Sequence, residues 1–201
     1  MASADAPAFL VLGRTSHGAL GIRLDALGAE IRRDEVSADA LTGWIAAAEA
    51  DWAPRWVWHD TPQWYASLLA EGVRVARCHD LRLCHAILRD SALVHEAAAV
   101  RTAAEWDASP HVDPVAAAPT LFDLDDTHRP SGPPAGADDA FAEFARQREA
   151  IAGSADPGRL RLLTAAESAG ALVAAEMRAA GLPWDADAHD RILVEILGER
   201  R

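Results

Sequence analysis

The segment CHDLRLCH, residues 78–85, contains two cysteines, two histidines and an aspartate within eight positions, and the chain contains no other cysteine. Structural zinc sites usually combine a C-x2-4-C pair with a second ligand pair well downstream, and no second pair follows here. If Asp80 caps a helix, Cys78 and His79 end a strand, whereas Cys84 and His85 lie on the helix. Six helical residues correspond to a net rotation of about 240°, so the two pairs do not share a face. We therefore expect no metal site, a buried Cys84 and partly solvated histidines.

The elements around this segment predict an α/β fold. FLVLG and ALGIRL alternate as two strands of a hairpin, and a helix is expected over about 38–50, capped by Ser37. RWVWH is a strand, Asp60 or Thr61 caps the next helix, Gly72 ends it, VRVARC is a strand, and Asp80 begins a helix to about Arg89. A strand–helix–strand unit with such short connections implies a parallel pair of strands near residues 56 and 75, joined by a right-handed crossover.

Composition divides the chain into three parts. Residues 1–101 form the predicted α/β domain, and residues 102–137 are rich in Pro, Ala and Asp without a sustained period, which is typical of a flexible linker. Residues 138–201 are predicted to be helical. One helix ends at Gly153, a second opens with the capping box Thr164-x-x-Glu167 and ends at Gly181, and the last begins near Asp185 or Asp187. The second helix should bury Leu172, Val173 and Met177.

Charge and hydropathy exclude several classes of protein. The 201-residue chain has a formal net charge of −12, and all its 19 basic residues are Arg, so a surface that coats nucleic acid generally is not expected. The amino terminus lacks the features of a signal peptide, and no segment approaches the roughly 20 apolar residues that span a bilayer. We expect a cytoplasmic protein with reduced thiols and no membrane partner.

Two stretches resemble family A (Pol I-type) DNA polymerases. AESAGALVAAEMRAAGLPWDADAHDRIL resembles the segment that joins the exonuclease domain of that family to its polymerase domain, and LLAEGVRVARCHDLRLCHAIL resembles the middle of the 3′–5′ exonuclease domain. More narrowly, the chain resembles the N-terminal part of actinobacterial bifunctional 3′–5′ exonuclease/DNA polymerases. The matching residues of the first stretch are Glu167, Glu176, Met177, Gly181, Leu182, Trp184 and Asp185.

The resemblance implies a reduced RNase H-like (exonuclease-like) mixed sheet with flanking helices, followed by a C-terminal helical hairpin that leads to a polymerase thumb. It implies the non-catalytic N-terminal region of a DNA-directed DNA polymerase, with DNA as the partner in replication or repair. The nucleotidyl transfer and its Mg²⁺ would belong to a polymerase part beyond Arg201, so the chain itself is expected to need no cofactor and to be a fragment or a truncated product.

The carboxylates that such exonucleases use to hold two metal ions are missing. The first strand should carry Asp-x-Glu, but FLVLGRTSH offers Gly13 and Thr15. The place of the next ligand, on the helix ahead of Gly72, is taken by Trp64, and no Tyr precedes Asp138 or Asp139 as the last motif requires. We therefore expect a catalytically inactive domain without catalytic or metal-binding residues.

The densest group of basic residues consists of Arg146, Arg148, Arg159 and Arg161, which are candidates for contacts with DNA phosphates. The alternative is a solvated face in which these arginines pair with neighbouring acids such as Glu143.

Leu121 and Phe122 form an apolar pair in the acidic segment PTLFDLDD, which suggests docking to a partner such as a sliding clamp, although the Gln that usually starts a clamp motif is absent. Two alternative functions stay open. One is a free-standing interaction module that binds a replication or repair partner. The other is an active metal-dependent 3′–5′ exonuclease with rearranged ligands, using His59, Asp60, His79 and Asp80.

Overall fold

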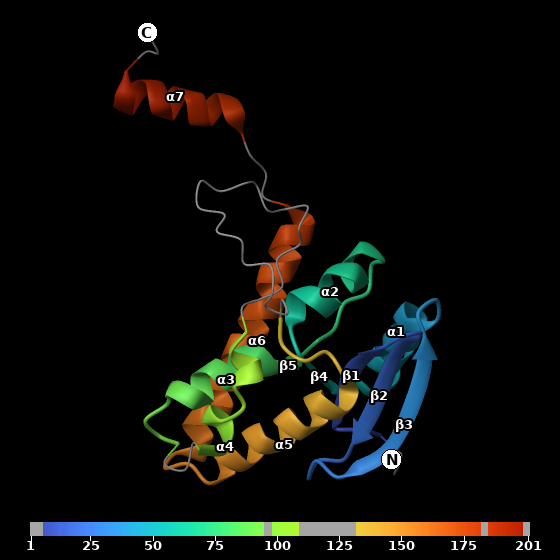
Figure 1. Ribbon diagram of the computed structural model, residues 1–201. Helices are drawn as coiled ribbons and strands as arrows, with labels where there is room; N and C mark the ends of the chain where they lie inside the picture. Colours follow the sequence, from blue (N-terminus) through green and yellow to red (C-terminus); the bar gives the residue numbers. More distant parts are fainter. Residues whose placement is uncertain (1–5, 95–97, 109–131, 182–184, 199–201) are drawn as a thin grey trace, which may run out of the picture.

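A computed structural model describes residues 6–94, 98–108, 132–181 and 185–198, in which a five-stranded sheet is flanked by helices (Figure 1). The strand order is β3-β2-β1-β4-β5. The strands are β1 (Phe9–Thr15), β2 (Gly18–Leu24), β3 (Glu30–Ser37), β4 (Arg55–Trp58) and β5 (Cys78–Asp80).

The sheet is mixed, with an antiparallel half and a parallel half. β1, β2 and β3 form an antiparallel meander in which Val11 pairs with Ile22, while β4 lies parallel to β1 and β5 lies parallel to β4. The helix α1 (Leu41–Trp52) connects β3 to β4, and α2 (Thr61–Ala70) connects β4 to β5. The predicted α/β class and the parallel strand–helix–strand unit are confirmed.

The remaining helices follow β5. They are α3 (Leu81–Asp90), α4 (Ala98–Arg101), the 3-10 helix η1 (Ala104–Asp107), α5 (Ala137–Ala152), α6 (Pro157–Ala180) and α7 (Ala186–Leu197). In Figure 1, α5 runs across one face of the sheet and α1 lies behind the other face. α6 contacts α2, α3 and β5, so the C-terminal helices α5 and α6 pack on the same sheet as the N-terminal elements.

The alternation of strand residues separates two cores. Leu10 and Leu12 pack with Trp56, Trp58 and the residues of α1 and α2, whereas Val11 and Val57 pack with Phe144 of α5. Because successive strand residues point to opposite faces, residues 9, 11, 55, 57 and 79 share the face that α5 covers. Trp56, Trp58 and Trp64 are buried in the first of these cores.

One strand and two element boundaries differ from the sequence prediction. β3 was not predicted, because Val36 is its single buried residue and its other side chains are mostly charged and solvent-facing. The strand predicted in VRVARC begins only at Cys78. α6 begins at Pro157 after an Asp156 cap, so Thr164 lies inside the helix instead of starting it, and its hydroxyl donates to the Leu160 carbonyl at 2.9 Å.

Two further predictions about helices were wrong in detail. The N-cap of α1 is Ala40, without a side-chain hydrogen bond, so Ser37 does not cap this helix. Of the apolar face predicted for α6, Leu172 is buried, but Val173 and Met177 are about half exposed. They lie beside the buried stripe of this helix, which follows Leu160, Thr164, Ser168, Leu172 and Ala175.

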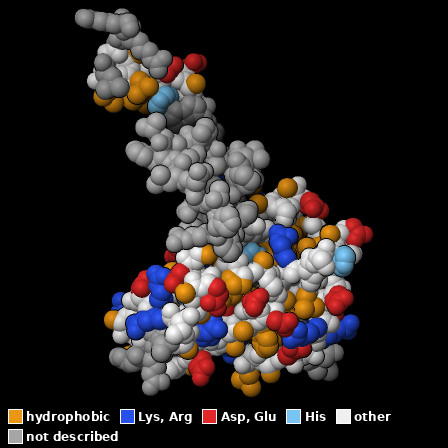
Figure 2. Space-filling view, in the orientation of Figure 1, with side chains coloured by type: hydrophobic (Ala, Val, Ile, Leu, Met, Phe, Trp, Pro, Cys, Tyr) orange, Lys and Arg blue, Asp and Glu red, His pale blue; other side chains and the backbone are white. Residues whose placement is uncertain are grey.

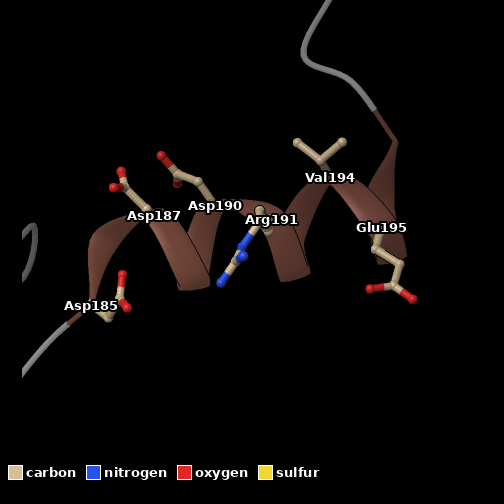
Figure 3. A pocket seen from close by; sticks show the side chains of 6 residues that line it. All are labelled: Asp185, Asp187, Asp190, Arg191, Val194 and Glu195. Atoms are coloured by element: carbon tan, nitrogen blue, oxygen red, sulfur yellow. The ribbon is translucent and has the colours of Figure 1, made fainter.

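α7 begins, as predicted, after the Asp185 cap, whose carboxylate accepts the Ala188 N–H at 2.9 Å. A shallow hollow lies along this helix, but the side chains that line it, drawn in Figure 3, project to different sides of the single helix. It is therefore not a shaped site. Hydrophobic side chains gather on one side of α7 in Figure 2. Among the described residues, no helix has the length and apolar composition needed to cross a membrane.

Candidate functional site

The carboxyl ends of the parallel strands, where α/β sheets usually bind ligands, are organised around Asp80. Its Oδ1 accepts the Leu83 N–H at 3.0 Å and caps α3, while its Oδ2 accepts the Thr61 N–H at 2.7 Å in the first turn of α2. The predicted cap of α3 is confirmed, and the same carboxylate also serves α2. Burial raises the pKa of Asp80, against the hydrogen bonds that favour its charged form. Both oxygens are thus committed to backbone donors.

The second carboxylate at this end, Asp60, is also buried. Its Oδ1 accepts from the Arg82 Nε at 3.0 Å, while its Oδ2 is buried and has no hydrogen-bond partner among the described residues. His59 accepts a hydrogen bond at Nδ1 from the Trp64 Nε1 at 3.1 Å. Of the four residues in the rearranged-ligand hypothesis, Asp80 caps helices and Asp60 forms an ion pair. His59 and His79 contact the aromatic rings of Trp64 and Phe144. In the described part of the chain, no group of three or more His, Cys, Asp or Glu is arranged to hold a metal ion.

The carboxyl end of β1 is closed by the start of α5. The Arg14 N–H donates to the Ala135 carbonyl at 2.7 Å. A Cβ added at Gly13 would lie 1.9 Å from the Ala137 nitrogen and 2.2 Å from its Cα. A side chain at position 13 therefore has no room, and the place where a first-strand carboxylate would project is filled by backbone.

The cysteines of CHDLRLCH lie, as predicted, on a strand and a helix. Cys78 ends in the core beside the Ser168 carbonyl, and Cys84 lies near the Thr164 carbonyl and the Ser168 hydroxyl, at 3.6 and 3.4 Å. Burial raises the pKa of the Cys78 thiol to about 12 and raises the pKa of Cys84 as well. Both are inert buried thiols, as the sequence suggested for Cys84.

The histidines of the same segment are buried, so the prediction of partly solvated rings was wrong. The His79 Nε2 lies 2.8 Å from the Gln147 Oε1, and the amide of Gln147 donates to the Leu81 carbonyl and to Glu143. Because Gln147 offers its oxygen to the ring, His79 carries its proton on Nε2. Burial lowers the pKa of His79 to about 4, so the ring is neutral near pH 7.

Glu143 extends this buried network toward η1. Its Oε1 lies 2.8 Å from the His85 Nδ1, and the His85 Nε2 lies 3.4 Å from Asp107. Glu143 also pairs with Arg146. The acceptors of the two histidines come from α5, far along the chain, and nothing in CHDLRLCH itself indicates them.

A separate pocket of about 440 Å³ lies between α5, α6 and the amino ends of β1 and β4. Three arginines line it, namely Arg55 at the start of β4, Arg148 on α5 and Arg161 on α6. Its other lining residues are Phe9, Ala26, His79, Phe144, Ile151, Ala152, Thr164 and Ala165. We call this hollow the arginine pocket. No described carboxylate lines it.

Two of the four arginines predicted to contact phosphates, Arg148 and Arg161, meet at the arginine pocket. Arg146 instead pairs with the buried Glu143, which agrees with the alternative that these arginines pair with neighbouring acids. It lines a different hollow, beside Glu149. Arg159 lies exposed in the first turn of α6. Arg55 was missed, because one arginine at the start of a Trp-rich strand gives no local signal of a site.

Leu121 and Phe122 lie outside the described residues. A scan of the sequence against protein-family models found no match, and searches of curated proteins and of solved structures found no match either. The inference of function therefore depends on the fold and on the chemistry of its residues.

Proposed function

We propose that this chain is a degenerate RNase H-like exonuclease domain with the first helices of a family A DNA polymerase thumb, and that it supports DNA binding without cleaving DNA. The observation that carries the proposal is the strand order β3-β2-β1-β4-β5, with an antiparallel meander followed by two parallel strands. This order and the helical crossovers α1 and α2 resemble the sheet of RNase H-like nucleases.

The loss of cleavage is supported by the state of the carboxyl end. The first-strand carboxylates are absent, the backbone of α5 fills the space beside Gly13, and Trp64 is buried where a second ligand would stand. Asp60 and Asp80 are held by Arg82 and by backbone N–H groups. Two metal ions would lack the set of carboxylates that two-metal hydrolysis requires.

A supporting role in DNA binding must work against a net charge of −12. Figure 2 shows acidic and basic side chains interspersed over the visible face of the body. Any contact with phosphates is therefore local, and Arg148 of α5 and Arg161 of α6, which line one pocket, are the candidates. The active polymerase and its Mg²⁺ would belong to residues after Arg201.

The absence of cleavage is tested by incubating the chain with single-stranded DNA and Mg²⁺ or Mn²⁺. We expect no degradation above the level of an Asp60→Asn variant, which removes a charge from the carboxyl end while keeping the shape of the side chain. Metal-dependent degradation that this variant abolishes would contradict the proposal and favour the rearranged-ligand nuclease. The assignment to a polymerase is tested by sequencing the gene on the 3′ side of the codon for Arg201, where a polymerase palm should be encoded.

A further inference from the structure

The arginine pocket collects cationic groups from three separate elements onto one face of the sheet. Arg55 pairs in register with Phe9, and Val57, two positions along, packs in the core beneath α5. Because alternate residues of a strand point to the same face, Arg55 points to the face that α5 covers, where Arg148 and Arg161 also line the hollow. The sheet places these residues together although they lie far apart in the chain.

These guanidinium groups are positioned by neutral acceptors. The Arg55 Nη1 donates to the Cys78 carbonyl at 3.0 Å, and the Arg148 Nη2 donates to the Ala26 carbonyl at 3.3 Å. In the described chain, no carboxylate forms an ion pair with Arg55, Arg148 or Arg161, whereas Arg33, Arg82 and Arg146 each pair with at least one. The positive charge of the pocket is therefore not neutralised by the described residues.

Arg148 is held in place and keeps unused hydrogen-bonding capacity. Its guanidinium carbon lies 5.1 Å from the centre of the Phe9 ring and 5.6 Å from that of Phe144, so aromatic faces support the group. Its Nη1 is buried and has no hydrogen-bond partner among the described residues. The Arg148 guanidinium is therefore fixed in place, with its positive charge unpaired by any described carboxylate.

The neutral wall of the pocket favours an anion with an organic part. His79 is uncharged near pH 7 because burial lowers its pKa to about 4, so it adds no further charge. Phe9, Phe144 and Ile151 provide apolar surface beside the arginines. The volume of about 440 Å³ lies within the roughly 300–1,000 Å³ typical of pockets for small organic ligands.

We propose that the arginine pocket binds a phosphomonoester, either that of a free nucleotide or the terminal phosphate of a DNA strand. A phosphomonoester carries a charge of about −1.5 to −2 at pH 7, which suits three guanidinium groups better than a single carboxylate does. The planar fork of arginine also matches phosphate oxygens in pairs. This site lies at the amino ends of β1 and β4, away from Asp60 and Asp80, and the proposal does not require that the chain belong to a polymerase.

The test compares Arg161→Gln with Arg159→Gln. Both arginines are exposed on α6, but Arg161 lines the arginine pocket and Arg159 does not. Calorimetric titration with deoxyadenosine monophosphate and with inorganic phosphate measures the affinity for a free nucleotide and for phosphate alone. Fluorescence anisotropy with one oligonucleotide, prepared with and without a 5′-phosphate, measures the affinity for the terminal phosphate of a DNA strand. Arg148→Gln provides an independent variant from α5, and circular dichroism verifies that each variant is folded.

We expect saturable binding of the nucleotide, or tighter binding of the phosphorylated oligonucleotide than of its unphosphorylated form. Arg161→Gln should weaken this binding at least about 10-fold, the usual effect of losing one charged hydrogen bond, whereas Arg159→Gln should retain it. Preference for the nucleotide identifies a small-molecule pocket, and preference for the phosphorylated end identifies a DNA-end pocket. No saturable binding of either ligand, or equal losses for Arg159→Gln and Arg161→Gln, would overturn the proposal.

Discussion

Asp80 accepts the backbone N–H of Thr61 at 2.7 Å, so a carboxylate at the end of β5 holds the first turn of α2. The same side chain caps its own helix through the Leu83 N–H. Asp60, the N-cap residue of α2, makes no capping hydrogen bond and instead pairs with Arg82. Asp80 thus holds the first turns of both α2 and α3, whereas Asp60 is joined to α3 only through Arg82, and the adjacent parallel strands are tied together by their helix starts.

We predict that Asp80→Ala lowers the free energy of unfolding by about 3 kcal/mol, because it removes one helix cap and leaves a second buried N–H without an acceptor. Urea denaturation followed by circular dichroism measures the change. Asp185→Ala is the matched control, since Asp185 caps the exposed helix α7 through a single bond. That variant should leave the main unfolding transition unchanged. Similar losses for the two variants would show that Asp80 has no role beyond an ordinary cap.

We predict that Gly13→Ala destabilises the protein by at least about 2 kcal/mol, because the added methyl group would overlap the backbone of Ala137 and displace α5 from β1. Gly43→Ala is the control. A Cβ at Gly43 meets no heavy atom within 4 Å, and Ala is favoured over Gly inside a helix, so this variant should be more stable than the wild type by about 0.5–1 kcal/mol. Thermal unfolding of the two variants distinguishes them, and a stable Gly13→Ala protein would show that α5 is not fixed against β1.

The features that the sequence predicted well are those encoded by adjacent residues. The cap of α3 follows from Asp80, and the cap of α7 follows from Asp185. The strand RWVWH was recognisable from its run of large apolar residues, and the side chains of Trp56, Val57 and Trp58 are fully buried.

The features that the sequence did not predict depend on partners far along the chain. The burial of His79 and His85 requires Gln147 and Glu143 of α5. The arginine pocket unites Arg55 with residues of α5 and α6, and no spacing within any one segment indicates this meeting. β3 was missed because an edge strand with mostly solvent-facing charged side chains lacks the apolar alternation by which strands are recognised.

His79 should make stability depend on pH in the acid range. Its folded-state pKa is about 4, below the unfolded value of about 6.5, so protons bind the unfolded chain more readily. The stabilisation from the neutral ring is complete above pH 6.5 and is lost as the pH falls toward 4, up to roughly 3 kcal/mol. Urea denaturation between pH 4 and pH 7 measures this loss.

The His79→Gln variant isolates this contribution, since it removes the titrating ring and keeps a donor for Gln147. The carboxyl group of Asp80, whose raised pKa has the opposite sign and favours stability at lower pH, is present in both proteins and cancels in the comparison. We expect a smaller loss of stability on acidification in His79→Gln than in the wild type. His17→Gln, which changes an exposed ring, should follow the wild type. Equal pH profiles for all three proteins would contradict the assignment.

The two thiols should be unreactive in the folded protein. Cys78 and Cys84 are 1% and 0% exposed, and burial raises the pKa of both, so neither offers the thiolate that attacks a thiol reagent. We predict that colorimetric thiol titration at pH 8 detects no fast-reacting group in the native chain and two in urea, with native rates at least about 10³-fold lower because reaction requires opening of the core. Ser16→Cys, which adds an exposed thiol in the β1–β2 turn, should react rapidly with one equivalent. Fast native reaction without this substitution would show that α6 separates readily from β5 and α3.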